Sequence, residues 1–237
     1  VGGNARSWVP QINRFSRKYR AVAWNMPGYG KSILIGEMSF PLLVGSLLAL
    51  IDDRGWRKVH LIGHSMGGMV AQEFAVAHQD RLHSLTLFAT SPAFGKQEGE
   101  FQKEFVESRL APLSAGVTMA ELADKLVDNM MSSNAHLSGK KIAYECMAGV
   151  SSDAYRAAIE CIVTFERRAN LPKIGVPTLA VAGELDTIAA ASMMEKMATK
   201  IPLCRYVCLP ELGHLANLED PPTFNAVLDN FLSTVTS

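Results

Sequence analysis

The sequence of 237 residues predicts an α/β fold, with a mostly parallel sheet, helices on both of its faces and an inserted helical cap. Three observations predict it. Short apolar segments alternate with segments of helical periodicity near both ends of the chain. Residues 92–171 contain helical patterns but no segment typical of a strand. A chain of this length with 48% hydrophobic residues suits one globular unit with an insertion better than two separate domains.

The strands expected in the first part of the chain are short, rich in β-branched or large apolar residues, and bounded by polar or turn-forming residues. Strands of this kind are buried on both faces of a parallel sheet. Helical segments with apolar residues on one face follow the first two strands. The expected strands are Ala21–Trp24, Val59–Ile62 and Leu85–Ala89, and the helices are Pro41–Arg54 and Met66–His78.

The same alternation returns near the end of the chain. Strands are expected at Thr178–Ala182 and Arg205–Leu209, each followed by a helix, at Ala190–Lys200 and Pro222–Thr234. Residues 1–91 and 172–237 therefore form the predicted core, and residues 92–171 form the predicted cap. Four amphipathic segments in the cap are separated by Gly, Ser, Pro and Asn.

The best candidate nucleophile is Ser65, in the segment Gly63-His64-Ser65-Met66-Gly67. The segment lies between an expected strand and an expected helix, which is the setting that a Gly-x-Ser-x-Gly nucleophile elbow needs. The glycines admit a sharp turn with the serine at its apex. At the start of the helix, the amide of Met66 becomes an oxyanion donor. The alternative interpretation is a serine that caps the helix in a glycine-rich turn.

A serine hydroxyl is a weak nucleophile and needs a base and an orienting acid, expected later in the chain in the order Asp, then His. Asp186 lies just past one expected strand, and His214 lies just past the last one. Both positions are carboxyl ends of strands, where open α/β sheets bind their ligands. Glu184 is the rival acid, but because it lies earlier in the segment its side chain would point along the sheet. His64 is expected to be a packed or hydrogen-bonded residue rather than a second base.

A second motif indicates a different function. Pro27-Gly28-Tyr29-Gly30-Lys31-Ser32 ends like a phosphate-binding loop. However, the first glycine of that loop would have to be residue 25, which is Asn25, and Pro27 removes a backbone donor. No convincing helix starts at Ser32. A nucleotide-binding protein is therefore the most distant of the alternatives.

The composition of the chain excludes several classes of binding partner. The 23 Lys and Arg residues balance the 23 Asp and Glu residues, so no overall charge favours nucleic acid. No apolar run is long enough to span a bilayer, and the N-terminus does not resemble a signal peptide. The four cysteines are expected to be free thiols, with no spacing typical of a metal site. These observations predict no metal, no nucleic-acid or membrane partner, and a cytoplasmic location.

The chain resembles the α/β-hydrolase superfamily over nearly its whole length. The resemblance is carried by the segments at 27–32 and 63–68, by Gly183-Glu184-Leu185-Asp186, and by Gly213-His214 with Glu219 five residues later. Within the superfamily, the sequence is similar to the 3-oxoadipate enol-lactonase and small carboxylesterase branch. Serine at position 65 argues against the haloalkane dehalogenases and epoxide hydrolases, which carry aspartate there.

Two features depart from the family. Members usually have aspartate where Asn25 stands, and we expect the loss of this carboxylate to have only a structural effect. The chain also starts inside the loop that follows His-Gly in the family, so the strands that precede this loop are expected to be missing. Either the chain is a fragment, or another chain or a rearranged segment fills the gap. If the loop is intact, the resemblance implies that the amide of Val1 or Gly2 is the second oxyanion donor.

The predicted function is hydrolysis of a small carboxylic ester or lactone by Ser65, His214 and Asp186, without a cofactor. Three alternatives stay open: another acyl-type hydrolase (a thioesterase, a carbon–carbon bond hydrolase or a perhydrolase), a non-catalytic binding protein on the same fold, and the nucleotide-binding protein. The expected partner is the small-molecule substrate. A homo-oligomer formed through the incomplete N-terminal sheet region is also left open.

Overall fold

The computed structural model describes residues 1–95 and 99–235. Its centre is a four-stranded sheet in the order β1-β2-β3-β4, and every pair of neighbouring strands is parallel. The strands are β1 (Val59–His64), β2 (Leu82–Phe88), β3 (Thr178–Gly183) and β4 (Cys204–Leu209). Four of the five expected strands are thus confirmed, along with the predicted parallel α/β architecture.

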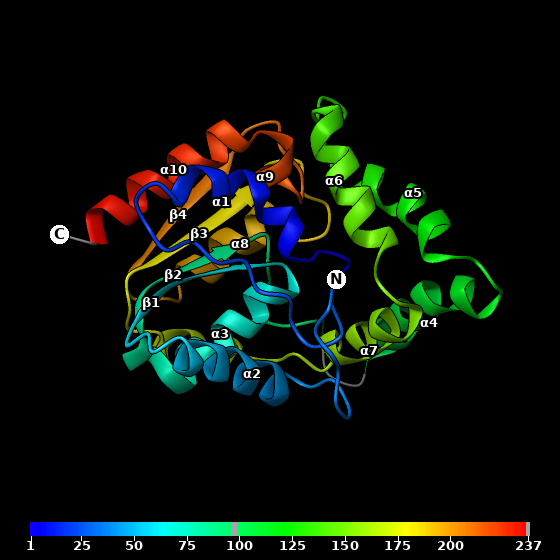
Figure 1. The fold of residues 1–237 in the computed structure, drawn as a ribbon, viewed down its shortest axis with the longest axis horizontal. Helices are drawn as coiled ribbons and strands as arrows, with labels where there is room; N and C mark the ends of the chain where they lie inside the picture. Colours follow the sequence, from blue (N-terminus) through cyan, green and yellow to red (C-terminus); the bar gives the residue numbers. More distant parts are fainter. Residues whose placement is uncertain (96–98, 236–237) are drawn as a thin grey trace.

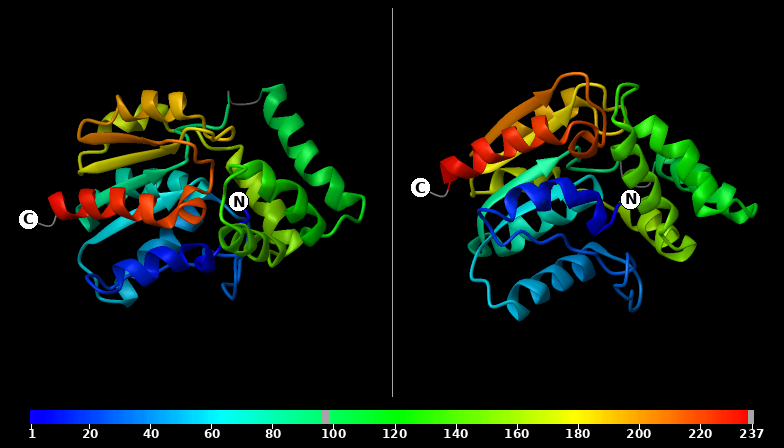
Figure 2. Two further views of the ribbon diagram at one scale, coloured as in Figure 1. Left: turned by 90° about the horizontal axis from the view of Figure 1, so that it is seen from above. Right: turned by 45° about the horizontal axis from the view of Figure 1, so that its top comes forward.

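Helices cover both faces of this sheet (Figures 1 and 2). One face carries α2 (Phe40–Asp53), α3 (Met66–His78) and α8 (Ala191–Ala198), and the other carries α1 (Val9–Phe15) and α10 (Pro221–Val235). Shorter turns are η1 (Ala5–Trp8), η2 (Gln79–Arg81) and α9 (Ala216–Glu219). Within the described ranges, no helix combines the length and the apolar character that crossing a membrane requires.

The strands separate two hydrophobic cores because successive side chains point to opposite faces of a sheet. Leu85 and Leu87 of β2 pack in the core beneath α2, α3 and α8, and that core continues into the cap. Phe88 packs in the other core with Phe15 of α1 and Phe224 of α10. All six residues of β3 are buried, which explains why its sequence is a continuous apolar run.

Four helices lie between β2 and β3 in the chain and form a group beside the sheet (Figure 1). They are α4 (Glu100–Ser114), α5 (Met119–Met130), α6 (Leu137–Ala148) and α7 (Ser152–Ile162), and η3 (Arg168–Lys173) leads back to the sheet. Thr118 starts α5 with a capping box to Glu121. The predicted cap, residues 92–171, contains all four helices, and it includes residues 96–98, which lie outside the described residues.

The strand expected at Ala21–Trp24 is wrong. These residues have no regular secondary structure, and β1 pairs only with β2 among the described residues. Residues 21–24 and residues 59–62 of β1 line the same cavity, and no backbone hydrogen bond joins these two described segments. A segment becomes a strand only when a neighbour completes its hydrogen-bond ladder, and residues 21–24 have no such neighbour among the described residues.

Candidate active site

Ser65 sits on the sharp turn between β1 and α3. Its backbone has φ 52° and ψ −120°, a region that non-glycine residues rarely adopt. Two contacts hold the turn in place: the Ser65 amide donates to the Phe88 carbonyl at 2.9 Å, and Thr90 Oγ1 donates to the Ser65 carbonyl at 2.7 Å. The structure therefore forms the predicted elbow, with the serine at its apex.

Close packing, rather than a positive φ, explains two of the glycines around Ser65. A Cβ on Gly63 would lie 2.4 Å from the Gly67 carbonyl oxygen, and a Cβ on Gly68 would lie 2.5 Å from Thr90 Cβ. Neither glycine has a positive φ. Gly68 thus lets α3 pack closely against the segment that follows β2, whereas a Cβ on Gly67 would meet nothing within 4 Å.

Ser65, His214 and Asp186 form one chain of hydrogen bonds. The Ser65 hydroxyl lies 3.1 Å from His214 Nε2, and His214 Nδ1 lies 2.8 Å from Asp186 Oδ2. The bond to the carboxylate places the imidazole proton on Nδ1 and leaves Nε2 free to accept the serine proton. The structure thus brings together three residues that are distant in the sequence but were all predicted to lie at strand ends.

Asp186 is held as a carboxylate. Its Oδ1 accepts hydrogen bonds from the amides of Ile188 (2.8 Å) and Ala189 (2.9 Å). Burial raises the pKa of Asp186, but the hydrogen bond and charge of His214, together with the two amides, outweigh burial and leave this pKa below its ordinary value. The rival acid, Glu184, is exposed and accepts from the Glu211 amide instead. Of the two candidate acids, only Asp186 forms a hydrogen bond with His214.

His64 is a structural neighbour of this chain rather than part of it. Its ring packs beside Phe88 and His214, with centroids 4.6 and 4.9 Å away. Its Nε2 lies 2.9 Å from the His214 carbonyl oxygen, to which it donates. Burial, followed by the proximity of His214, lowers the pKa of His64 well below its ordinary value, so the ring is neutral. This agrees with the hydrogen-bonded role expected from the sequence.

The loop that carries His214 is anchored by a buried carboxylate. Glu219 is 2% exposed and accepts from the amides of Gly213 (3.1 Å), Leu215 (3.2 Å) and Ser132 (2.7 Å). Ser132 follows α5 in the cap, so one carboxylate ties the histidine loop to the cap. The sequence resemblance included Glu219 but gave it no role; its place shortly before the long helix expected at Pro222–Thr234 was the only local signal.

The chain start lies beside the nucleophile. Val1 and Gly2 line the same cavity as Ser65 and Met66. Met66 is the first residue of α3, so its amide has no partner within the helix. Gly2 has φ 94°, and a Cβ there would lie 2.7 Å from Cε of Met147. The residues predicted as oxyanion donors therefore line the same cavity.

Asn25 fixes the segment that follows Gly2. Its Oδ1 accepts from the Ala5 amide at 2.8 Å. A Cβ on Gly30 would lie 2.7 Å from the Asn25 side chain, and Gly30 also has φ 57°, so glycine is required there. The amide side chain thus has the structural role expected of it. No helix begins at Ser32, whose hydroxyl donates to the Asn25 carbonyl, and this geometry does not match a phosphate-binding loop.

A cavity of about 490 Å³ runs from Ser65 along the outer edge of β1. Two methionines of the cap, Met130 and Met147, line it. Met147 is also buried in the hydrophobic core, together with Met119 and Met131. Tyr29 also lines the cavity, and its hydroxyl is buried without a hydrogen-bond partner among the described residues. The walls are mainly apolar, as expected for a small-molecule site.

Comparison with known families agrees with this geometry. The profile of the α/β-hydrolase fold family matches residues 1–221. The chain belongs to the α/β-hydrolase family. This α/β hydrolase is similar to a 3-oxoadipate enol-lactonase of Acinetobacter baylyi, with 26% identity over 99% of the chain and 86% of the relative. It is also similar to a pimeloyl-[acyl-carrier protein] methyl ester esterase of Aeromonas hydrophila, with 26% identity over 98% of the chain and 92% of the relative.

Solved structures show the same fold. A thermophilic esterase from Thermogutta terrifontis superposes on this α/β hydrolase with a TM-score of 0.90 and 24% identity, over 99% of the chain and 87% of the esterase. At that identity the likeness establishes the fold and leaves the substrate to be argued from the site.

Proposed function

We propose that this α/β hydrolase cleaves a small carboxylic ester or lactone through an acyl-enzyme formed on Ser65. The observation that carries the proposal is the chain of hydrogen bonds from Ser65 through His214 to Asp186, at the wall of an apolar cavity. The names of the two relatives, a lactonase and a methyl ester esterase, add support because both describe hydrolysis at an ester-type carbonyl.

The proposed acylation begins when His214 Nε2 takes the proton of Ser65 as its oxygen attacks the substrate carbonyl carbon. Asp186 holds the imidazole in the required tautomer and stabilises the imidazolium that forms. The proton then passes from His214 to the leaving alkoxide, and the carbon–oxygen bond of the ester breaks. In a lactone the alcohol stays attached to the acyl group.

The negative charge of the tetrahedral intermediate needs donors that are already in place. The Met66 amide is one, since it heads α3 and lines the cavity. The backbone nitrogen of Val1 or the amide of Gly2 is the proposed second donor, because both residues line the cavity beside Ser65. Water, deprotonated by His214, then attacks the acyl-enzyme and releases the acid and Ser65. These steps require neither a metal nor an organic cofactor.

Hydrolysis of p-nitrophenyl acetate tests the proposal. The Ser65→Ala variant is expected to lose at least about 10⁴-fold in kcat, since the remaining groups cannot form the acyl-enzyme. Ser108→Ala, which removes an exposed hydroxyl on α4, serves as the matched control and should keep the wild-type rate. Equal rates for the wild type and Ser65→Ala would contradict the proposal and favour a non-catalytic binding protein.

A further inference from the structure

Every polar group of His214 has a hydrogen-bond partner. Its ring nitrogens contact Ser65 and Asp186. Its main-chain carbonyl accepts from His64 Nε2 at 2.9 Å, and its main-chain amide donates to the Met130 carbonyl at 2.8 Å. Three of these partners belong to the core, whereas Met130 is the last residue of α5 in the cap. One of the four contacts that place this imidazole therefore comes from the cap.

The Met130 carbonyl is able to accept because a helix ends there. The last carbonyls of an α-helix have no partner within the helix. The next residue, Met131, has φ −119° and ψ 154°, so the chain leaves α5 in an extended conformation. It then turns into α6, which begins at Leu137. The α5–α6 turn, defined as residues 130–136, thus begins with an acceptor that belongs to the main chain and does not depend on the type of side chain.

A second main-chain group of the α5–α6 turn holds the same loop. The Ser132 amide donates to Glu219 Oε2 at 2.7 Å, and this buried carboxylate also accepts from the amides of Gly213 and Leu215, on either side of His214. The Ser132 hydroxyl oxygen is buried without a hydrogen-bond partner among the described residues. The contact therefore depends on the amide of Ser132 and not on its side chain.

Close packing joins the turn to the loop that carries His214. A Cβ on Gly213 would lie 2.9 Å from the Met130 carbonyl oxygen and 3.2 Å from the Ser132 nitrogen. Gly213 has no positive φ, so the close approach, rather than the backbone conformation, requires glycine there. Beyond the turn, a Cβ on Gly139 of α6 would lie 2.1 Å from the Leu218 carbonyl oxygen. Cap and loop are thus in contact at successive positions.

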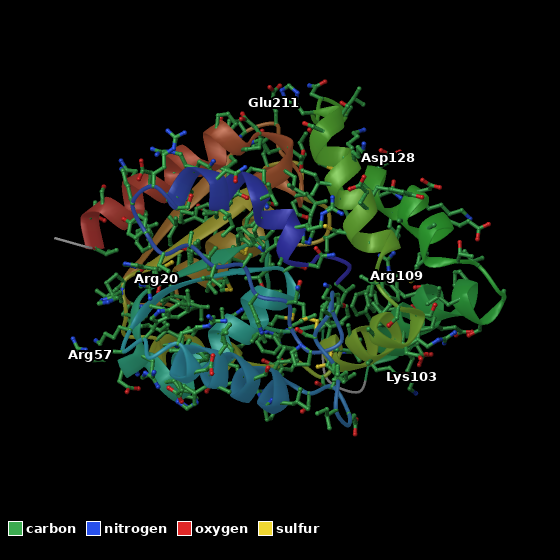
Figure 3. All side chains as sticks on the ribbon, viewed as in Figure 1. Arg20, Arg57, Lys103, Arg109, Asp128 and Glu211 are labelled. Atoms are coloured by element: carbon green, nitrogen blue, oxygen red, sulfur yellow. The ribbon has the colours of Figure 1, made fainter. Side chains whose placement is uncertain are left out.

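The opposite side of the α5–α6 turn faces water. Asp128, near the end of α5, pairs with Lys140 of α6 at 3.2 Å, and 71% of the Asp128 side chain is exposed. Figure 3 places Asp128 at the outer surface of the cap. An exposed ion pair of this kind contributes little to stability. The turn therefore has a buried side that contacts the loop and an exposed side that does not.

We infer that the α5–α6 turn is a positioning element for His214, the base of the proposed reaction. The main-chain groups of Met130 and Ser132 hold the loop so that Nε2 of the base meets Ser65. This inference rests on the proposed function. A displacement of about 1 Å at a reacting group can lower a rate about a hundredfold. The base is therefore in place only while the cap is seated on the core, and Ser65 is activated in that state.

Main-chain contacts leave the side chains of the cap available for the substrate. Met130 combines both roles, since its carbonyl holds the His214 amide and the residue is among those that line the cavity. Side chains of the cap can then differ between enzymes of different selectivity while the base stays in the same place.

Ser132→Pro tests the positioning element because proline has no N–H to donate to Glu219. The extended conformation of Met131 is the one that a residue before proline prefers. We expect kcat for p-nitrophenyl acetate and p-nitrophenyl butyrate to fall by the same factor, roughly tenfold to a hundredfold. KM should change by less than about threefold, because the walls that bind the ester remain. Labelling of Ser65 by a fluorophosphonate should slow by the same factor as kcat.

Two variants of the same turn separate positioning from general damage to the cap. Ser132→Ala keeps the amide and should keep the wild-type kcat. Asp128→Asn breaks the exposed ion pair and should also keep it. The proton NMR signal of His214 Nδ1–H, which is bonded to Asp186, should shift or broaden in Ser132→Pro and stay unchanged in both controls.

Gly213→Ala approaches the contact from the side of the loop. Its Cβ would press on the Met130 carbonyl, so kcat and the NMR signal should change as in Ser132→Pro. Gly45→Ala is the matched control, because a Cβ there would meet nothing within 4 Å. If Ser132→Pro does not fold, the comparison between Gly213→Ala and Gly45→Ala decides the question.

A folded Ser132→Pro or Gly213→Ala variant with the wild-type kcat and NMR signal would overturn the inference. An equal loss of kcat in Ser132→Pro, Ser132→Ala and Asp128→Asn would also overturn it, since the cap would then be sensitive to any change. Failure of the proposed function looks different, because p-nitrophenyl acetate would then be cleaved equally by the wild type and Ser65→Ala.

Discussion

The sheet edge and the cap face each other across the cavity, yet their polar groups differ. At the sheet edge, Asp186, His214 and Glu219 each have hydrogen-bond partners within the chain. On the cap side, the residues that line the cavity include Met130, Ala143 and Met147, whose side chains are apolar. Paired polar groups fix a geometry, whereas apolar walls contact the apolar part of a substrate. The sheet edge therefore suits the chemistry, and the cap suits the choice of substrate.

If this division is correct, a substitution at the sheet edge should affect every ester equally. Asp186→Asn has the largest expected effect, a loss of about 10⁴-fold in kcat, because the amide stabilises the wrong tautomer of His214. Steady-state rates with p-nitrophenyl acetate and with p-nitrophenyl butyrate should fall by the same factor. A loss below tenfold, or one confined to one of the two esters, would contradict the separation of chemistry from selectivity.

Glu219 connects the two regions, because it accepts hydrogen bonds from the loop that carries His214 and from the cap. A glutamine there has only one oxygen to serve the amides of Gly213, Leu215 and Ser132. Glu219→Gln should therefore lower the free energy of unfolding by about 1–3 kcal/mol, measured by urea denaturation.

The control for Glu219→Gln is Glu184→Gln, which alters an exposed carboxylate bonded to one amide and should change stability by less than about 0.5 kcal/mol. Equally small effects of both substitutions on the free energy of unfolding would contradict the anchoring role of Glu219.

His64 gives a smaller effect that depends on pH. Burial lowers its pKa in the folded protein, so on acidification the unfolded chain takes up the proton first. The stabilisation is complete above about pH 6.5 and is lost as the pH falls below that value, by about 1.4 kcal/mol per pH unit until the folded-state pKa is reached.

His64→Gln, which can still donate to the His214 carbonyl, should flatten this decline in urea midpoints measured between pH 7.5 and 5.5. The burial of His60 also lowers its pKa, so a weaker decline should remain in the variant. An unchanged slope would show that His64 does not remain neutral as the protein is acidified.

The sequence was most informative where short-range rules apply. The order of Ser65, Asp186 and His214 and their positions after strands predicted a contact between residues up to 149 positions apart, because parallel strands gather their carboxyl ends at one edge. The strand at Ala21–Trp24 was not predictable in this way, because a strand depends on its neighbour as well as on its own residues.

Labelling with a fluorophosphonate probe tests the central claim most directly, because only an activated serine reacts readily with it. The account predicts a single adduct on the peptide that contains Ser65, formed rapidly in the wild type, much more slowly in Asp186→Asn and not at all in Ser65→Ala. Ester hydrolysis should disappear in proportion to the labelling. An adduct on another serine, or hydrolysis that persists with Ser65 fully labelled, would contradict the account.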